Sequence, residues 1–244
     1  MDGLRGFTRL LEQHTEDGFL YRVDLNLRPW GRSGPLFMAI DDMEHYYEAS
    51  SDAWERFAWL RARPVAGAIA LGEELRQRLG PFMYRRSLST DDLEKIVGMK
   101  HELSRTRQRR GSWNVKLGDG GIRDIEFFIQ TLQLVNAARH PVLQQTNTLA
   151  TLEGLEAGRL VPATDAAAAA GSYLFLRRLE NRLQMLDEQQ THELPDDPAV
   201  RRMLARSLGI DGGPDVLDRF EAELLTHRAV ARGCFERILP ADGG

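Results

Sequence analysis

The sequence predicts a mainly α-helical protein: a bundle-like helical body that follows a short α/β segment over residues 1 to about 36. Apolar residues recur every three or four positions through most of the chain after residue 40, whereas only one stretch alternates with a period of two. The chain has 244 residues, of which 42% are hydrophobic, so it can bury a substantial core in one large domain or in a small domain beside a larger one. Long helices with short connections favour a bundle.

Charge and cysteine content exclude several classes of protein. The formal charge of -4 and the pI near 5.9 argue against a dedicated nucleic-acid binder, which needs a net basic face. The single cysteine, Cys234, can form neither an intramolecular disulfide nor a thiolate metal cluster, so we expect a reducing cytoplasm and interpret Cys234 as a core thiol. No stretch approaches the roughly 20 apolar residues of a membrane helix.

The first elements are a short helix over residues 7–14 and then the only convincing long strand. In that strand an apolar face alternates with a polar face made of Arg22, Asp24, Asn26 and Arg28. Pro29 and the glycines that follow end it. A single strand is not stable alone, so either part of a sheet is missing from the chain or the strand pairs with residues 36–40 and 113–117.

The rest of the chain reads as amphipathic helices. Pro198 and Pro214 suit first helical positions, and Gly209 ends the helix between them. The apolar spacing predicts one or two helices over 43–63 and further helices over 93–100, 122–135 and 164–186.

Asp24 is unusual because a carboxylate in the middle of a strand is disfavoured. It could form an ion pair with Arg22 or Arg28 on the same face. It could instead bind a hard cation such as Mg²⁺, with the neighbouring arginines on phosphate. The residues alone leave both explanations open.

Two glycine-containing loops could bind an anion. The loop 30–36, which contains Ser33 and Gly34, is a weak signal. Residues 113–130 are more informative, because glycines precede a helix start whose N–H groups could cradle phosphate between Lys116 and Arg123. Carboxylates near that helix start could simply offset the helix dipole. The basic run at 105–110 is interpreted as a solvated helix end rather than an RNA site, and the six histidines suggest no zinc site.

Several long motifs resemble the glutamine synthetase adenylyltransferase family, whose members attach AMP to a tyrosine of glutamine synthetase and remove it. The motifs are DGFLYRVDLNLRPWGRSGPL, MEHYYEASSDAWERFAWLRARPVAG, PFMYRRSL, NVKLGDGGIRDIEFFIQTLQL and SYLFLRRLENRLQMLDEQQTHELPDD. The resemblance implies that residues 1–40 are the C-terminal part of a nucleotidyltransferase palm and that residues 41–244 form a helical domain. It is closest to the N-terminal half of the family protein, which removes AMP by phosphorolysis and releases ADP.

The same resemblance implies site residues, a cofactor and partners. Asp24 matches the third metal carboxylate of the palm and would bind Mg²⁺, while the Gly-Ser motif and the DxD pair that precede it in the family are absent. We therefore expect a truncated chain that is inactive alone. The partners implied are glutamine synthetase, a PII-type regulatory protein, ATP, ADP or AMP, and phosphate, with no nucleic acid and no membrane. The expected nucleotide or phosphate contacts are Arg22, Arg28, Ser33, Gly34, Lys116, Gly120, Gly121, Arg123 and Glu126.

A second hypothesis assigns no chemistry to the chain. The helical body would then be a binding module that docks glutamine synthetase or a PII-type regulator. The presence of an in-frame Gly-Ser and DxD segment upstream would favour the enzyme over the module.

Overall fold

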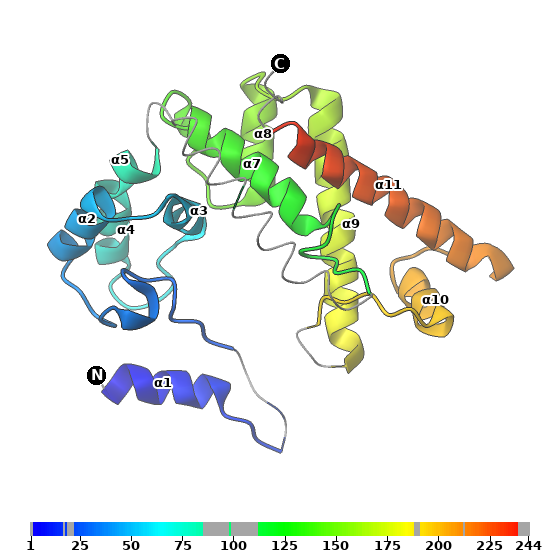
Figure 1. Cartoon of the computed structure of the whole chain (residues 1–244), viewed down its shortest axis with the longest axis horizontal. Coiled ribbons are helices and arrows are strands. Elements are labelled where there is room, and N and C mark those ends of the chain that lie inside the picture. The colour runs from blue at the N-terminus through cyan, green and yellow to red at the C-terminus, as the bar shows by residue number, and fades with distance from the viewer. Residues whose placement is uncertain are drawn as a thin grey trace. The chain divides into compact units, whose positions relative to one another are not determined.

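The protein is described by a computed structural model over residues 2–16, 18, 22–84, 98, 112–187, 191–211 and 213–238. Across these residues there are ten α-helices and no β-strand, which confirms the mainly α class. The chain divides into two compact units, Met1–Met83 and Tyr84–Gly244 (Figure 1). The division of the chain at residue 40 stays a prediction.

Aromatic side chains form the core of the first unit, whose described residues contain five helices. They are α1 (Asp2–Glu12), α2 (Ile40–Ala49), α3 (Ala53–Arg61), α4 (Ile69–Arg78) and α5 (Gly80–Met83). Of the one or two helices predicted over 43–63, the structure thus has two, α2 and α3. Tyr47 of α2 connects α3 and α5. The centroid of its ring lies 5.3 Å from that of Trp59 in α3 and 5.1 Å from that of Phe82 in α5. Such edge and tilted contacts between aromatic rings stabilise a core beyond their buried area.

The predicted strand is wrong over the residues that the structure describes. Residues 22–26 belong to no helix or strand, and residues 19–21 lie outside the described part of the chain. Leu27, expected on the apolar face, is 66% exposed. The described structure gives this segment no neighbouring strand, so its backbone groups bond elsewhere. The Val23 N–H, for example, donates to Oε1 of Glu12 at 3.0 Å.

The second unit is a bundle of longer helices. Its helices are α7 (Ile122–Asn136), α8 (Thr148–Ala157), α9 (Ala163–Asp187), α10 (Pro198–Ser207) and α11 (Val216–Glu236). Pro198 is the first residue of α10, and the Asp197 side chain accepts from the Ala199 N–H at 2.8 Å, so this helix start is confirmed. Pro214 instead lies in the short 3₁₀ turn Gly213–Asp215 just before α11. The helix predicted over 93–100 lies outside the described residues, apart from residue 98.

Helix α11 packs against α7, α9 and α10, and α7 also contacts α8 (Figure 1). The apolar spacing that predicts α9 places buried leucines on one side, since Leu176, Leu179 and Leu183 are at most 1% exposed. Phe220 of α11 is fully buried in the same core. The bundle prediction therefore holds for this unit.

Two short backbone segments, residues 113–115 and 192–194, pair near the start of α7. The Val115 N–H donates to the carbonyl of His192 at 2.8 Å, and the Leu194 N–H donates to the carbonyl of Trp113 at 2.9 Å. Residues 113–117 were a predicted partner of the N-terminal strand. In the described structure they pair with residues 192–194 instead.

Cys234 is confirmed as a core thiol. Its side chain is 6% exposed in α11, and burial raises the pKa of the thiol to about 11. Within the described ranges, no helix combines the length and the apolar character that crossing a membrane requires.

Leu179 tests the core of the second unit. Replacing it with alanine should lower the free energy of unfolding by about 2 to 5 kcal/mol, because the side chain is fully buried and leaves a cavity. Leu174→Ala on the same helix is the matched control, since Leu174 is 42% exposed and should cost about 0.5 kcal/mol. Urea unfolding followed by circular dichroism measures both. Equal losses would contradict the packing of α9.

Candidate functional site

Asp24 lies on the surface of the first unit. Its side chain is exposed, and Oδ1 accepts a hydrogen bond from the Asn26 N–H at 2.8 Å. Among the described residues, neither Arg22 nor Arg28 forms an ion pair with it. Arg22 is exposed, and Arg28 points its side chain elsewhere. An ion pair with Arg22 or Arg28 therefore does not explain Asp24. Its carboxylate is exposed to solvent.

Arg28 organises the loop that follows Asp24. Its Nε donates to the carbonyl of Gly34 at 3.1 Å and its Nη2 donates to the carbonyl of Arg32 at 3.2 Å. Its Nη1 donates to the carbonyl of Leu25. A planar guanidinium has five N–H donors in a rigid fork, so three of the five are used to fold residues 25–34 into one turn. Contact between Arg28 and phosphate stays a prediction.

The glycines of the loop are explained by backbone geometry. A Cβ atom at Gly34 would lie 1.8 Å from the carbonyl oxygen of Pro29, so no other residue fits. Trp30 has a left-handed φ of 57°, and Ser33 is exposed in the 3₁₀ turn Gly31–Ser33. Binding of an anion by Ser33 and Gly34 is not needed to account for the sequence, and it stays a prediction.

The loop is docked on α2 and α3 through a buried carboxylate. The Trp30 N–H donates to the hydroxyl of Tyr46 at 3.3 Å, and the two ring centroids lie 4.6 Å apart. The Tyr46 hydroxyl in turn donates to Glu55, at 3.1 and 3.2 Å from its two oxygens. Glu55 is 4% exposed and also accepts from the Asp52 N–H at 2.8 Å. Burial raises the pKa of both Tyr46 and Glu55.

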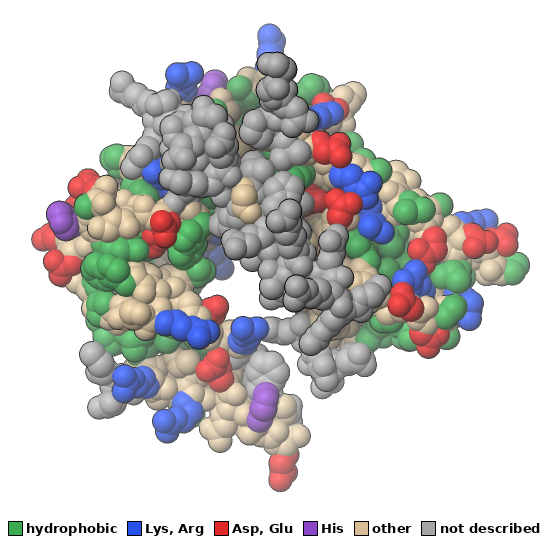
Figure 2. Space-filling model, in the orientation of Figure 1, with side chains coloured by type: hydrophobic (Ala, Val, Ile, Leu, Met, Phe, Trp, Pro, Cys, Tyr) green, Lys and Arg blue, Asp and Glu red, His purple; other side chains and the backbone are tan. Residues whose placement is uncertain are grey.

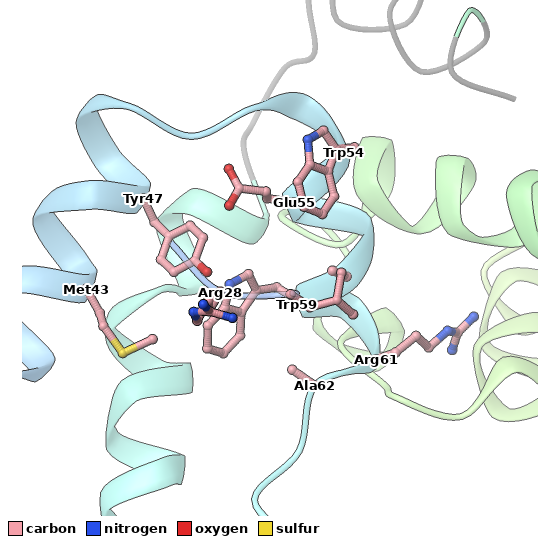
Figure 3. Close-up of a pocket in the computed structure, with 10 residues that line it drawn as sticks. Arg28, Met43, Tyr47, Trp54, Glu55, Trp59, Arg61 and Ala62 are labelled. Carbon is pink, nitrogen blue, oxygen red and sulfur yellow. The ribbon is translucent and has the colours of Figure 1, made fainter. Parts of the chain in front are cut away.

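A pocket of about 370 Å³ lies where this loop meets the helices (Figure 3). Leu27 and Arg28 come from the loop, Met43 and Tyr47 from α2, and the other residues from α3 and its C-terminal end. The full lining is Leu27, Arg28, Met43, Tyr47, Trp54, Glu55, Ala58, Trp59, Arg61 and Ala62. The wall is thus mostly apolar and aromatic with three charged groups.

Several exposed arginines lie in α1 and in the segment that carries Asp24. Arg5 and Arg9 of α1 line an open depression together with Leu25, and the bond from Val23 to Glu12 holds α1 to the segment that carries Asp24. Arg22 and Arg32 are exposed in the same part of the chain. Figure 2 shows arginine side chains in blue, with some acidic side chains in red, over the region where Figure 1 draws α1 and the loop. An anionic substrate would be attracted to this region.

The described residues do not form a complete metal site. No group of three or more His, Cys, Asp or Glu side chains within the described ranges is arranged to hold a metal ion. Asp24 is a suitable single ligand for a hard cation, because it is an exposed carboxylate. Asp24 alone does not form the three-carboxylate metal site that the resemblance implies.

The glycine loop before α7 does not offer the free N–H groups that the sequence predicts. The N–H groups of Ile122 and Arg123 donate to the carbonyls of Val115 and Lys116, each at 3.0 Å. The Gly121 N–H donates to the carbonyl of Gly118 at 2.9 Å, and the Gly120 N–H donates to Oδ2 of Asp124 at 2.8 Å. These donors are satisfied within the loop. That part of the phosphate-cradle prediction is corrected.

Gly120 and the charged residues near it serve packing in this structure. Gly120 has a φ of 71°, and a Cβ atom there would lie 2.6 Å from the carbonyl oxygen of Arg228 in α11. Arg123 pairs with Glu126 one turn later at 2.9 Å, a common solvated arrangement. Contacts of Lys116, Gly121 and Arg123 with nucleotide stay predictions that this geometry disfavours.

Glu180 of α9 is a buried carboxylate that sequence reasoning missed. It is 3% exposed and lies 2.6 Å from Nη1 of Arg177 and 3.0 Å from Nδ1 of His192. Burial raises its pKa, but the His192 hydrogen bond and the charges of Arg177 and Lys116 outweigh burial, so the pKa is lowered. The sequence does contain a signal for the burial of Glu180, because this residue follows Leu176 by four positions and so falls on the apolar face of α9.

The predicted site residues therefore fall into two groups. Asp24, Arg22, Arg28, Ser33 and Gly34 lie close together in sequence in the first unit, around the loop. Residues 116–126 belong to the second unit and are held in a hydrogen-bonded helix start.

Two protein-family models match the chain. The model described as glutamate-ammonia ligase adenylyltransferase matches residues 5–78, which contain Asp24, the loop and the pocket. The model described as GlnD PII-uridylyltransferase matches residues 95–239, more than half of the 244 residues. Both descriptions name enzymes that transfer a nucleotidyl group.

Gly120 tests the packing of the glycine loop on α11. Gly120→Ala should lower the free energy of unfolding by at least about 2 kcal/mol, because it combines a left-handed backbone with a clash against the Arg228 carbonyl. Gly233→Ala is the control within α11, where a Cβ atom meets nothing within 4 Å. That change should be neutral or stabilise by up to about 1 kcal/mol. Urea unfolding curves measure both, and a harmless Gly120→Ala would refute the loop geometry.

Proposed function

The chain belongs to the glutamine synthetase adenylyltransferase-like family of nucleotidyltransferases, and we propose that it contributes to the removal of AMP from a tyrosine of glutamine synthetase. Glutamate-ammonia ligase is another name for glutamine synthetase, on which this family acts. The observation that supports the proposal most directly is Asp24, an exposed carboxylate beside exposed arginines within the segment that the adenylyltransferase model matches.

The proposed reaction is phosphorolysis. An oxygen of inorganic phosphate forms a bond to the phosphorus of the tyrosine-linked AMP, and the bond from that phosphorus to the tyrosine oxygen breaks. The tyrosine oxygen takes up the proton that hydrogen phosphate loses, and the products are ADP and unmodified tyrosine. Both reacting groups are anionic, so Arg5, Arg9 and Arg22 around Asp24 would attract them and reduce their mutual repulsion.

Mg²⁺ is the metal generally used in the family, and Asp24 would hold it as one ligand. Bound there, the metal would stabilise negative charge on the transferring phosphoryl group. Asp24 is the single palm carboxylate that we assign in this chain. We therefore expect activity only when a Gly-Ser and DxD segment of a nucleotidyltransferase palm completes the site, whether on the same polypeptide or supplied in trans.

Asp24 gives the test of this function. With the palm segment supplied, Asp24→Asn should lower the rate of ADP release from adenylylated glutamine synthetase and phosphate by about 10³-fold, or roughly 4 kcal/mol of transition-state stabilisation. Asp42→Asn, an exposed carboxylate in the first turn of α2, is the matched control and should leave the rate unchanged. Near-parental turnover in Asp24→Asn, with the helical circular dichroism retained, would refute the role.

A second candidate function is recognition of a PII-type regulator by the second unit. It is favoured by one observation, the match of residues 95–239 to a model that is described as a PII-uridylyltransferase. This function would need no chemistry from Asp24. Retention of the chain on an immobilised PII-type protein, equally for the parent and for Asp24→Asn, would support it, and no retention would count against it.

A further inference from the structure

We propose that the pocket between the loop 25–34 and helices α2 and α3 binds the adenine ring of an adenine nucleotide. The inference rests on the proposed function, because it names the place where the nucleotide is held. The pocket encloses about 370 Å³, within the range of small-ligand sites. Figure 3 shows its lining side chains converging from the loop, from α2 and from α3.

The aromatic wall suits a flat, uncharged ring. Tyr47, Trp54 and Trp59 all line the pocket, and Tyr47 and Trp59 are already fixed against each other at a centroid distance of 5.3 Å. Trp54 remains 37% exposed, so part of its ring surface is open to a ligand. Stacking of a nucleobase on an aromatic side chain is favourable for every base, which makes these residues the main source of affinity.

Glu55 distinguishes among bases. A carboxylate offers about four acceptor positions, and the Glu55 oxygens accept from the Tyr46 hydroxyl and from the Asp52 N–H. Acceptor capacity therefore remains for an N–H of a ligand. The exocyclic amino group of adenine supplies two such N–H groups. Uracil places two carbonyl oxygens beside its single N–H donor, and a carboxylate repels them.

The charges at the pocket favour a ligand that carries phosphate. Arg28 lies in the lining together with the carboxylate of Glu55. The Arg28 guanidinium uses three of its five N–H groups on loop carbonyls and keeps two for a ligand. The side chain of Arg61 points away from the aromatic rings in Figure 3, so Arg28 is the cation placed next to them. A cationic ligand would be disfavoured here.

The two family matches separate adenine from uracil. Every lining residue falls between residues 27 and 62, within the match to the adenylyltransferase model. The match to the uridylyltransferase model begins at residue 95, outside the pocket. The family model that covers the pocket describes an adenylyltransferase, and adenine is also the base that the Glu55 carboxylate favours.

Isothermal titration calorimetry of the full chain in metal-free buffer tests the inference with three probes: ADP, UDP and inorganic pyrophosphate. ADP should bind at least about tenfold more tightly than UDP or pyrophosphate, because stacking and the Glu55 contact act on the base. Absence of ADP binding would overturn the inference. So would equal affinities for the three probes, because phosphate groups on surface arginines would then explain the binding.

Two substitutions locate the bound base. Trp54→Ala should weaken ADP binding about tenfold and Trp54→Phe should restore most of it, since phenylalanine still stacks. Phe37→Ala is the control, because Phe37 is 57% exposed and lies outside the pocket lining. Unchanged ADP affinity in Trp54→Ala would overturn the inference.

The same assay separates this inference from the proposed function. Asp24→Asn should bind ADP like the parent chain without metal, because Asp24 does not line the pocket. A chain that binds ADP in the pocket while Asp24→Asn keeps full transfer activity would refute the proposed role of Asp24 alone. A chain that transfers but does not bind ADP in the pocket would refute the adenine site alone.

Discussion

The guanidinium of Arg28, bonded to the carbonyls of three residues between Leu25 and Gly34, is the interaction on which the candidate site depends. It turns the chain back on itself just after Asp24, and this brings the Trp30 N–H to the Tyr46 hydroxyl. Leu27 and Arg28 then form one wall of the pocket. Without this fork, residues 25–34 lose the three side-chain hydrogen bonds that hold the loop in this conformation. The exposed carboxylate and the pocket would both lose their common support.

The helices were predictable because their signals are local. The three-and-four spacing of Leu176, Leu179 and Leu183 and the proline after Asp197 each specify a helix face or start within a few residues. The strand prediction failed for the opposite reason. Alternation describes which side chains could share a face, but a strand also needs a partner for its backbone, and the described structure gives residues 22–26 none. Tertiary pairing decided the outcome.

The candidate site shows the same limit. The sequence correctly singled out Asp24 as an exposed polar group, yet it could not reveal that Arg28 donates to three backbone carbonyls of the loop. The N–H groups at the start of α7 could be counted from the sequence, but the Val115 and Lys116 carbonyls that satisfy them come into place only through folding. Glu55 is similar: the sequence places it in the third position of a helix, whereas its burial against Tyr46 depends on the docked loop.

Hydrogen exchange of the loop amides in Arg28→Lys tests this dependence most directly. Lysine keeps the charge but cannot bridge three carbonyls, so the Gly31, Ser33 and Gly34 amides should exchange about tenfold faster, while amides within α2 and α3 keep their rates. Arg32→Lys, which alters an exposed side chain of the same loop, should change neither. Unchanged exchange of the loop amides in Arg28→Lys would contradict the account.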